Sequence, residues 1–240
     1  MKQMKHYKRI LLKLSGESLA AKDGYGIGAD MLQAYVNEIV SVYEQKTEVA
    51  VVLGGGNIFR GLTGSNQGFD RVQGDYIGML ATVINSLALQ SALQNAGVPS
   101  VVLSGLAIDP LCEKMSRQRA IDYIEKGFVT IIAGGTGNPY FTTDSAAALR
   151  AIEIKADVLL KGTRVDGIYS ADPEKDPNAV KFEHLTFQEA YSKNLKIMDL
   201  TAFTLCRENN IPLIVFDVNR KGNLKEILIE GKSNGTLVKN

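Results

Sequence analysis

The segment 133–144 combines residue types that bind phosphate, since three glycines, three threonines and one aspartate lie between an apolar run and a helical pattern. Glycine lets backbone amides close around an anion, and each threonine hydroxyl adds a donor. Residues 128–132 before it are typical of a buried strand, and residues 145–152 after it are strong helix formers. A simple turn needs neither this length nor so many hydroxyls. Because ligands of open α/β sheets bind where strands end, we predict a phosphate site here.

Three other loops place a cation beside flexible backbone, again where an apolar run ends. They are residues 13–17, residues 54–61 with Arg60, and residues 161–163. A lysine supplies a point charge, and an arginine supplies a planar fork that grips two oxygens. Together with the segment 133–144, these loops supply more binding groups than one phosphate requires. They predict a site for several phosphates, held either as one polyphosphate or as a donor beside an acceptor.

Phosphoryl transfer suits such a set, because the protein's main task there is to align donor and acceptor and to neutralise charge. Three aspartates have more than one possible role. Asp144 could cap a helix, contact a ligand or orient a catalytic lysine. For Asp75, at the start of another predicted helix, capping competes with contact to a sugar hydroxyl. For Asp199, capping is the main interpretation.

The familiar nucleotide motifs are incomplete. Residues 231–233 read Gly-Lys-Ser, like the end of a P-loop, but Glu226 stands where the first glycine is needed. Residues 24–29 satisfy G-x-G-x-x-A without a convincing strand before them. The protein-kinase motifs H-R-D and D-F-G are missing, and neither His6 nor His184 lies beside a plausible nucleophile. These gaps argue against P-loop, dinucleotide-binding, protein-kinase and histidine-driven hydrolase chemistry.

Composition bounds the class of protein. With 240 residues that are 45% hydrophobic, the chain can bury one large α/β domain or two modest lobes. A net charge of +1 is too small to produce an overall electrostatic field that attracts nucleic acid or an anionic membrane. Cys112 and Cys206 are far apart and are expected to be ordinary buried thiols. The first apolar run is too short for a signal peptide or membrane span, so we predict a cytoplasmic protein.

Strand-like and helix-like segments alternate along the chain. Continuous apolar, β-branched runs occur at residues 10–12, 49–53, 101–103, 129–132, 158–160 and 213–216. Such runs are typical of strands covered on both faces. Helical spacing between them, as at Met31, Tyr35, Ile39 and Val42, predicts a mostly parallel sheet wrapped by helices. Residues 162–182 interrupt the pattern, and Asp166-Gly167 suggests a tight hairpin at a seam between lobes.

The motifs together resemble those of the bacterial uridylate kinases, which belong to the amino-acid kinase superfamily. The segments that carry the resemblance are residues 13–17, 54–61, 74–82, 136–144 and 161–173. They occur in the family's order, and the match runs from about residue 8 to the C-terminus. The resemblance implies an α/β three-layer sandwich with helices on both faces of a mostly parallel sheet. It also implies a single domain over residues 1–240, with an acceptor lobe at 1–155 and an ATP lobe at 156–240.

The implied activity is transfer of a phosphoryl group from ATP to UMP, giving ADP and UDP, with Mg²⁺ accompanying ATP. The residues implied to bind ATP are Lys13, Leu14, Ser15, Gly16, Gly56, Arg60, Thr163, Tyr169 and Asp172. Those implied to bind UMP are Gly55, Asp75 at the ribose, Thr136, Gly137, Asn138, Pro139, Tyr140, Phe141, Thr142 and Thr143. Lys13 and Arg60 would contact the transferring phosphates. We interpret Lys161 as a second charge stabiliser and Asp144 as the group that orients the lysines; no metal ligand is assigned.

The family also implies a cytoplasmic homohexamer with GTP and UTP as candidate effectors. Residues 21–26 resemble the region tied to GTP activation, whereas residues 108–115 depart from the family pattern. Two other readings stay open. An amino-acid or carbamate kinase of the same superfamily would share the ATP half, but residues 138–143 argue against it. A non-catalytic nucleotide-binding or oxyanion-storage protein is opposed by the cations Lys13, Arg60 and Lys161.

Overall fold

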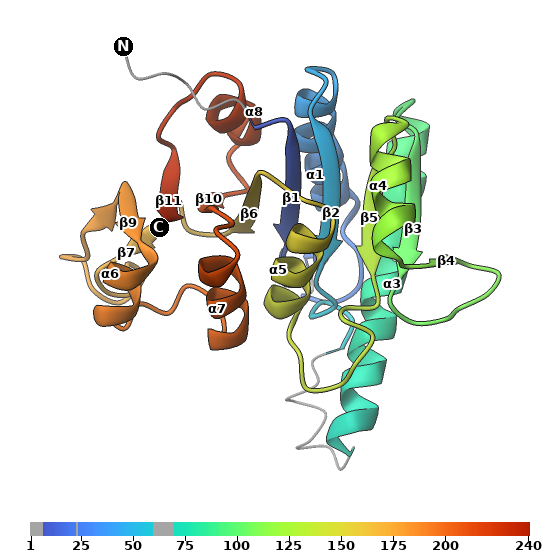
Figure 1. Ribbon diagram of the computed structural model, residues 1–240, viewed down its shortest axis with the longest axis horizontal. Helices are drawn as coiled ribbons and strands as arrows, with labels where there is room; N and C mark the ends of the chain where they lie inside the picture. Colours follow the sequence, from blue (N-terminus) through green and yellow to red (C-terminus); the bar gives the residue numbers. More distant parts are fainter. Residues whose placement is uncertain (1–6, 23, 60–69) are drawn as a thin grey trace.

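A nine-stranded sheet runs through the molecule in the order β4-β3-β5-β2-β1-β6-β10-β11-β9 (Figure 1). The computed structural model describes residues 7–22, 24–59 and 70–240. The strands of this sheet are β1 (Arg9–Leu14), β2 (Glu48–Leu53), β3 (Ser100–Ser104), β4 (Glu113–Lys114), β5 (Val129–Ala133), β6 (Val158–Thr163), β9 (His184–Thr186), β10 (Leu213–Asp217) and β11 (Gly235–Lys239). All neighbours pair in parallel except β10 and β11, so the predicted mostly parallel sheet is confirmed.

Helices connect the strands in the alternation that the sequence predicted. They are the 3₁₀ helix η1 (Glu17–Leu19), α1 (Ala29–Tyr43), α3 (Arg71–Asn95), α4 (Arg117–Glu125), α5 (Thr143–Glu153), α6 (Phe187–Ser192), α7 (Leu200–Glu208) and α8 (Asn223–Leu228). All six predicted apolar runs lie within strands β1, β2, β3, β5, β6 and β10. Each was recognisable because a strand buried on both faces needs apolar side chains at successive positions.

The helices form a layer on each face of the sheet, as alternate residues of β1 demonstrate. Ile10, Leu12 and Leu14 pack in one core with buried side chains of α1, α3 and α8. Leu11 points to the opposite face and packs in a second core with α4, α5, α6 and α7. The predicted three-layer sandwich is therefore confirmed (Figure 1). Lys13 follows the alternation and lies on the α5 face.

The longest described helix, α3, is apolar enough to cross a membrane by length and composition alone, with a mean hydropathy of 1.4 over its best window. Core helices of soluble proteins meet the same test, and 44% of that window is buried inside this structure. Val83, Leu89 and Leu93 of α3 pack in the core that α1 and α8 share. The helix thus serves as part of one layer, and its first turns extend beyond the sheet edge (Figure 1).

The tight hairpin expected at Asp166-Gly167 is wrong. The short strand β7 (Ile168–Tyr169) pairs antiparallel with β8 (Lys181–Phe182), across an intervening loop, and does not fold back on β6. The backbone amide of Ile168 donates instead to Thr236 Oγ1 at 2.8 Å, which attaches β7 to β11. Asp166 accepts from Lys181 Nζ of β8 at 2.8 Å, so this segment contacts residues distant in the sequence.

Candidate active site

Two lysines lie side by side at the carboxyl ends of the central strands. Lys13 of β1 is in direct register with Lys161 of β6, so their side chains leave the same face of the sheet. Parallel neighbouring strands are about 4.8 Å apart, a separation at which two ammonium groups repel each other. Their exposed side-chain fractions are only 13% and 14%. Such a pair requires a nearby anion.

Asp144, in the first turn of α5, supplies that anion. Its Oδ1 lies 3.0 Å from Lys13 Nζ, and its Oδ2 accepts a hydrogen bond from Lys161 Nζ at 2.6 Å. Lys161 Nζ also donates to the carbonyl of Ile197 at 2.7 Å. Burial raises the pKa of Asp144, but the two ammonium groups outweigh burial and hold this pKa below its usual range. Burial lowers the pKa of Lys161 despite the attraction of Asp144.

The loops after β1 and β2 approach each other so closely that one position must be glycine. A Cβ on Gly16 would lie 2.4 Å from the carbonyl oxygen of Gly54, well inside van der Waals contact. The loops thus bring the backbone at Gly16 next to that at Gly54, at the strand ends where Lys13 also lies. This contact explains why a glycine follows Ser15 in the first loop.

The β5–α5 loop, residues 134–142, follows β5 as predicted and leads directly into α5. Gly134, Gly135 and Gly137 have φ values of +69°, +57° and +82°, which favour glycine. Tyr140 also adopts a positive φ, +71°, which is uncommon for a residue with a Cβ. At its end, Thr142 caps α5 by accepting from the amide of Ser145 at 3.1 Å.

Three cavities open along this edge of the sheet, and adjacent cavities share residues. The names acceptor, central and donor cavity refer to the predicted site residues that line each of them. The acceptor cavity, of about 560 Å³, is lined by Glu17, Gly55, Gly56, Phe59, Gly74, Asp75, Gly78, Met79, Thr82, Gly135, Thr136, Phe141, Thr142 and Thr143. The central cavity, of about 210 Å³, is lined by Lys13, Ser15, Glu17, Ser18, Lys161, Gly162, Thr163 and Arg164. The donor cavity, of about 550 Å³, extends from Lys161 and Thr163 to Tyr169, Asp172 and Ile197. Glu17 joins the first two cavities, and Lys161 and Thr163 join the last two.

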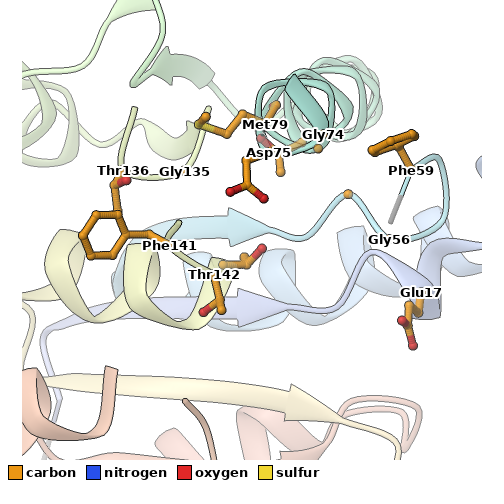
Figure 2. Close-up of a pocket in the computed structure, with 14 residues that line it drawn as sticks. Glu17, Gly56, Phe59, Gly74, Asp75, Met79, Gly135, Thr136, Phe141 and Thr142 are labelled. Atoms are coloured by element: carbon orange, nitrogen blue, oxygen red, sulfur yellow. Dashed lines mark hydrogen bonds between the residues drawn. The ribbon is translucent and has the colours of Figure 1, made fainter. Parts of the chain in front are cut away.

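Figure 2 is a close-up of the acceptor cavity. Asp75 and Met79 project from α3 toward Thr136, Phe141 and Thr142 of the β5–α5 loop. Glu17 lies at the lower right of the view, below Gly56. The cavity is thus walled by α3, by the β5–α5 loop, and by residues that follow β1 and β2.

Many of the predicted site residues line one of the three cavities. Six predicted UMP residues line the acceptor cavity, namely Gly55, Asp75, Thr136, Phe141, Thr142 and Thr143. Gly137, Asn138, Pro139 and Tyr140 belong to the same loop but do not line that cavity. Lys13 and Ser15 line the central cavity, and Thr163, Tyr169 and Asp172 line the donor cavity.

Four predicted ATP residues differ from this arrangement, and one of them, Gly16, lines none of the three cavities. Gly56 lines the acceptor cavity, so it lies on the acceptor side of the junction. The Leu14 side chain is fully buried in the core, which leaves only its backbone to face a ligand. Arg60 lies outside the described residues.

The capping interpretations of two aspartates are wrong, and the third is confirmed. Asp70, not Asp75, caps α3, and Thr142, not Asp144, caps α5. Asp199 does cap α7, accepting from the amide of Ala202 at 3.0 Å. It also accepts hydrogen bonds from Thr142 Oγ1 and, at 2.8 Å, from Ser145 Oγ. Asp199 therefore ties the start of α7 to the start of α5.

Sequence reasoning missed side chains that hold the β5–α5 loop from outside. Thr82 Oγ1 accepts from the amide of Gly134 at 2.9 Å, and Arg150 Nη2 donates to the carbonyl of Gly135 at 3.1 Å. Arg150 is only 6% exposed. Its position among the small apolar residues of α5 was an available signal, because a charged residue on a buried helix face needs a partner. Both cysteines are buried free thiols, as expected.

Comparison with known proteins agrees with this geometry. The chain belongs to the amino acid kinase family, whose model matches residues 8–217. It is 57% identical over 237 residues to the uridylate kinase of Parabacteroides distasonis, covering 99% of this chain and 100% of that one. Its fold is similar to the crystal structure of UMP kinase from Bacillus anthracis, with a TM-score of 0.94, 36% identity, and 98% and 97% of the two chains covered. UMP kinase from Ureaplasma parvum gives a TM-score of 0.92 at 42% identity, with 97% and 99% covered.

Proposed function

We infer that this chain catalyses the transfer of the γ-phosphoryl group of ATP to UMP, giving ADP and UDP. The observation that carries this inference is the series of three joined cavities with Lys13 and Lys161 at the junction. Two cavities of similar size suit two nucleotides, and the small cationic cavity between them suits the phosphates that react. Close similarity to uridylate kinases over nearly the full chain supports the same activity.

In this arrangement UMP occupies the acceptor cavity and the base and ribose of ATP occupy the donor cavity. An oxygen of the UMP phosphate attacks the γ-phosphorus, and the bond from that phosphorus to the β,γ-bridging oxygen breaks. The electron pair leaves with ADP. The attacking phosphate is already ionised near neutral pH, since its second pKa is about 6, so the step needs no general base. The protein's contribution is alignment and charge stabilisation.

We propose that Lys13 and Lys161 stabilise charge on the moving phosphoryl group, with Asp144 holding both ammonium groups in place. The backbone at Ser15 and Gly16 contributes amides to the phosphates. Arg60, outside the described residues, is proposed to grip phosphate as its sequence position suggests. On the acceptor side Asp75 binds the ribose, and the β5–α5 loop selects the uracil.

Mg²⁺ is proposed to accompany ATP. Among the described residues no group of three or more His, Cys, Asp or Glu side chains could hold a metal ion. Magnesium suits that arrangement, because it keeps several waters and binds through substrate phosphates with one or two carboxylates at most. Glu17, which lines both the acceptor and central cavities, would be a carboxylate near such an ion. When bound, the ion neutralises charge on the phosphates.

One coupled assay tests the activity: release of ADP is measured with UMP, CMP, dTMP, glutamate and carbamate offered in turn. We expect turnover to be strongly selective for UMP. Preference for glutamate or carbamate would instead indicate another kinase of the superfamily. Binding of nucleotides without any ADP release would indicate a non-catalytic protein.

Replacing Asp75 by asparagine is expected to raise the KM for UMP about tenfold or more, because hydrogen bonds to a charged group contribute roughly 1.5–3 kcal/mol. The KM for ATP should change little, because Asp75 lines the acceptor cavity and not the donor cavity. Steady-state kinetics with each substrate varied in turn measure both constants. Asp122→Asn, an exposed aspartate on α4, is the matched control. An unchanged KM for UMP would remove Asp75 from the ribose site.

The family resemblance also supports proposals about organisation and setting. We propose that residues 1–155 form the acceptor lobe and residues 156–240 the ATP lobe, in a cytoplasmic homohexamer with GTP and UTP as effectors. Light scattering tests the assembly, since a hexamer has six times the chain mass of 26.1 kDa. Initial rates with added GTP or UTP test the effectors. Within the segment 21–26 tied to GTP, Asp23 lies outside the described residues.

A further inference from the structure

Arg71, the first residue of α3, contacts the carboxylate of Asp75 one turn further along the helix. Its Nε lies 2.9 Å from Asp75 Oδ2 and 3.1 Å from Asp75 Oδ1. Asp75 lines the acceptor cavity, whereas Arg71 does not. Figure 2 shows the Asp75 carboxylate projecting into that cavity. Arg71 therefore holds the carboxylate from outside the cavity and fixes its orientation.

The same carboxylate and the same arginine also contact the β5–α5 loop. The amide of Tyr140 donates to Asp75 Oδ2 at 2.7 Å, and the guanidinium carbon of Arg71 lies 5.6 Å from the centroid of the Tyr140 ring. A guanidinium within about 6 Å of an aromatic centroid makes a favourable cation–π contact. Tyr140 is thus bound to α3 through both its backbone and its side chain.

Tyr140 depends on these contacts because its own conformation provides little support. Its φ of +71° is sparsely populated for residues with a Cβ, and it persists only where the surroundings hold it. The residue is 67% exposed, so burial contributes little. At the other end of the loop, by contrast, Gly134 and Gly135 are bound by Thr82 and by the buried Arg150. The Tyr140 end rests on α3 through polar contacts at the surface.

We propose that Arg71 is a positioning residue for the acceptor nucleotide. It holds Asp75 ready for a sugar hydroxyl and, together with Asp75, holds the β5–α5 loop against α3 at the edge of the cavity. Free protein thus already has its acceptor site in the binding geometry, and UMP does not have to order the loop. This inference rests on the proposed function, since it concerns UMP as the ligand of that cavity.

Kinetics give the first test. Replacing Arg71 by glutamine is expected to raise the KM for UMP about fivefold, the size expected from an exposed ion pair and a cation–π contact together. The kcat and the KM for ATP should stay near wild type. Arg71→Lys keeps the charge but lacks the planar guanidinium, so it should recover part of the loss. Arg220→Gln, which removes an exposed arginine paired with Glu226 on α8, is the control and should leave all three constants unchanged.

Hydrogen exchange in the ligand-free protein gives the second test, and it does not depend on activity. The amide of Tyr140 should exchange faster in Arg71→Gln and in Asp75→Asn than in wild type, whereas the amide of Gly134 should keep its protection. Unchanged exchange at Tyr140, or an unchanged KM for UMP, would overturn the inference. Failure of the proposed function looks different: wild type would then show no UMP-dependent ADP release, whatever the exchange rates.

Discussion

Replacing Lys13 by alanine is expected to lower kcat about 10²–10³-fold, the usual effect of removing one well-aimed group that stabilises charge in a transition state. Lys13 lines the central cavity, where the phosphates react, and not the acceptor cavity. The KM for UMP should therefore stay within about twofold, because the interaction lost is made chiefly in the transition state. The fold should tolerate the change, since Asp144 keeps its hydrogen bond with Lys161.

Lys8→Ala is the matched control for this experiment. Lys8 immediately precedes β1, but its side chain is 74% exposed and pairs with Glu48 away from the cavities. Its removal should leave kcat unchanged. Steady-state kinetics at saturating ATP, with thermal unfolding to check the fold, distinguish the two variants. A folded Lys13→Ala protein with wild-type kcat would exclude Lys13 from the chemistry.

Replacing Asp144 by asparagine is expected to damage both stability and turnover. It leaves two adjacent, mostly buried ammonium groups without their shared anion, and breaking a buried ion pair typically costs about 3 kcal/mol or more. Turnover should fall as well, because Lys13 and Lys161 lose the group that fixes their positions. Chemical denaturation measures the first effect and kcat the second. We expect Asp144→Asn to be clearly less stable than Lys13→Ala.

A double variant separates the two effects of Asp144. Adding Lys161→Met to Asp144→Asn removes one of the two unpaired cations, so stability should recover in part while kcat stays low. Recovery of kcat would show that Asp144 acts on charge balance alone. If the single variant is as stable as wild type at pH 7, the ion pairs contribute nothing to folding.

The contribution of Asp144 to the free energy of unfolding depends on pH in the acid range. Because its folded pKa is lowered, its contribution is complete above the unfolded value of about 3.9 and is lost as the pH falls through the folded pKa. The difference in melting temperature between wild type and Asp144→Asn should therefore narrow below about pH 4. Thermal unfolding of both proteins above and below this pH measures the difference in melting temperature. A difference that does not change with pH would contradict the lowered pKa of Asp144.

The local elements could be predicted because their signals are local. Continuous apolar runs identified six strands, and three- and four-residue spacing identified α1. The two-residue strands β4, β7 and β8 gave no such signal, because a segment of two residues is too short to show a hydrophobic pattern. The hairpin expected at Asp166-Gly167 failed for a related reason. The segment instead contacts Lys181 and Thr236, which are distant in the sequence and which no local pattern identifies.

The residues that cap α3 and α5 could not be predicted from local sequence patterns. Asp75 and Asp144 both lie near a helix start, but the boundaries differ by a few residues from those expected, so Asp70 and Thr142 cap instead. That shift matters for function, because an aspartate in a cap is committed to backbone amides. Asp75 and Asp144 do not cap their own helices. Asp75 binds Arg71 and the amide of Tyr140 in the β5–α5 loop, and Asp144 binds the two lysines.

The sequence by itself determined the kinds of residue available: cations and glycines after apolar strands, and a loop of glycines and threonines before a helix. It also determined their family resemblance, because ordered motifs need no knowledge of contacts. Only the tertiary structure decided which of these residues meet. Lys13 and Lys161 become neighbours through the register of β1 with β6, and α5 then carries Asp144 onto the same face. Which distant strands become neighbours depends on packing of the whole sheet, so no local pattern in the chain specifies that these two strands meet.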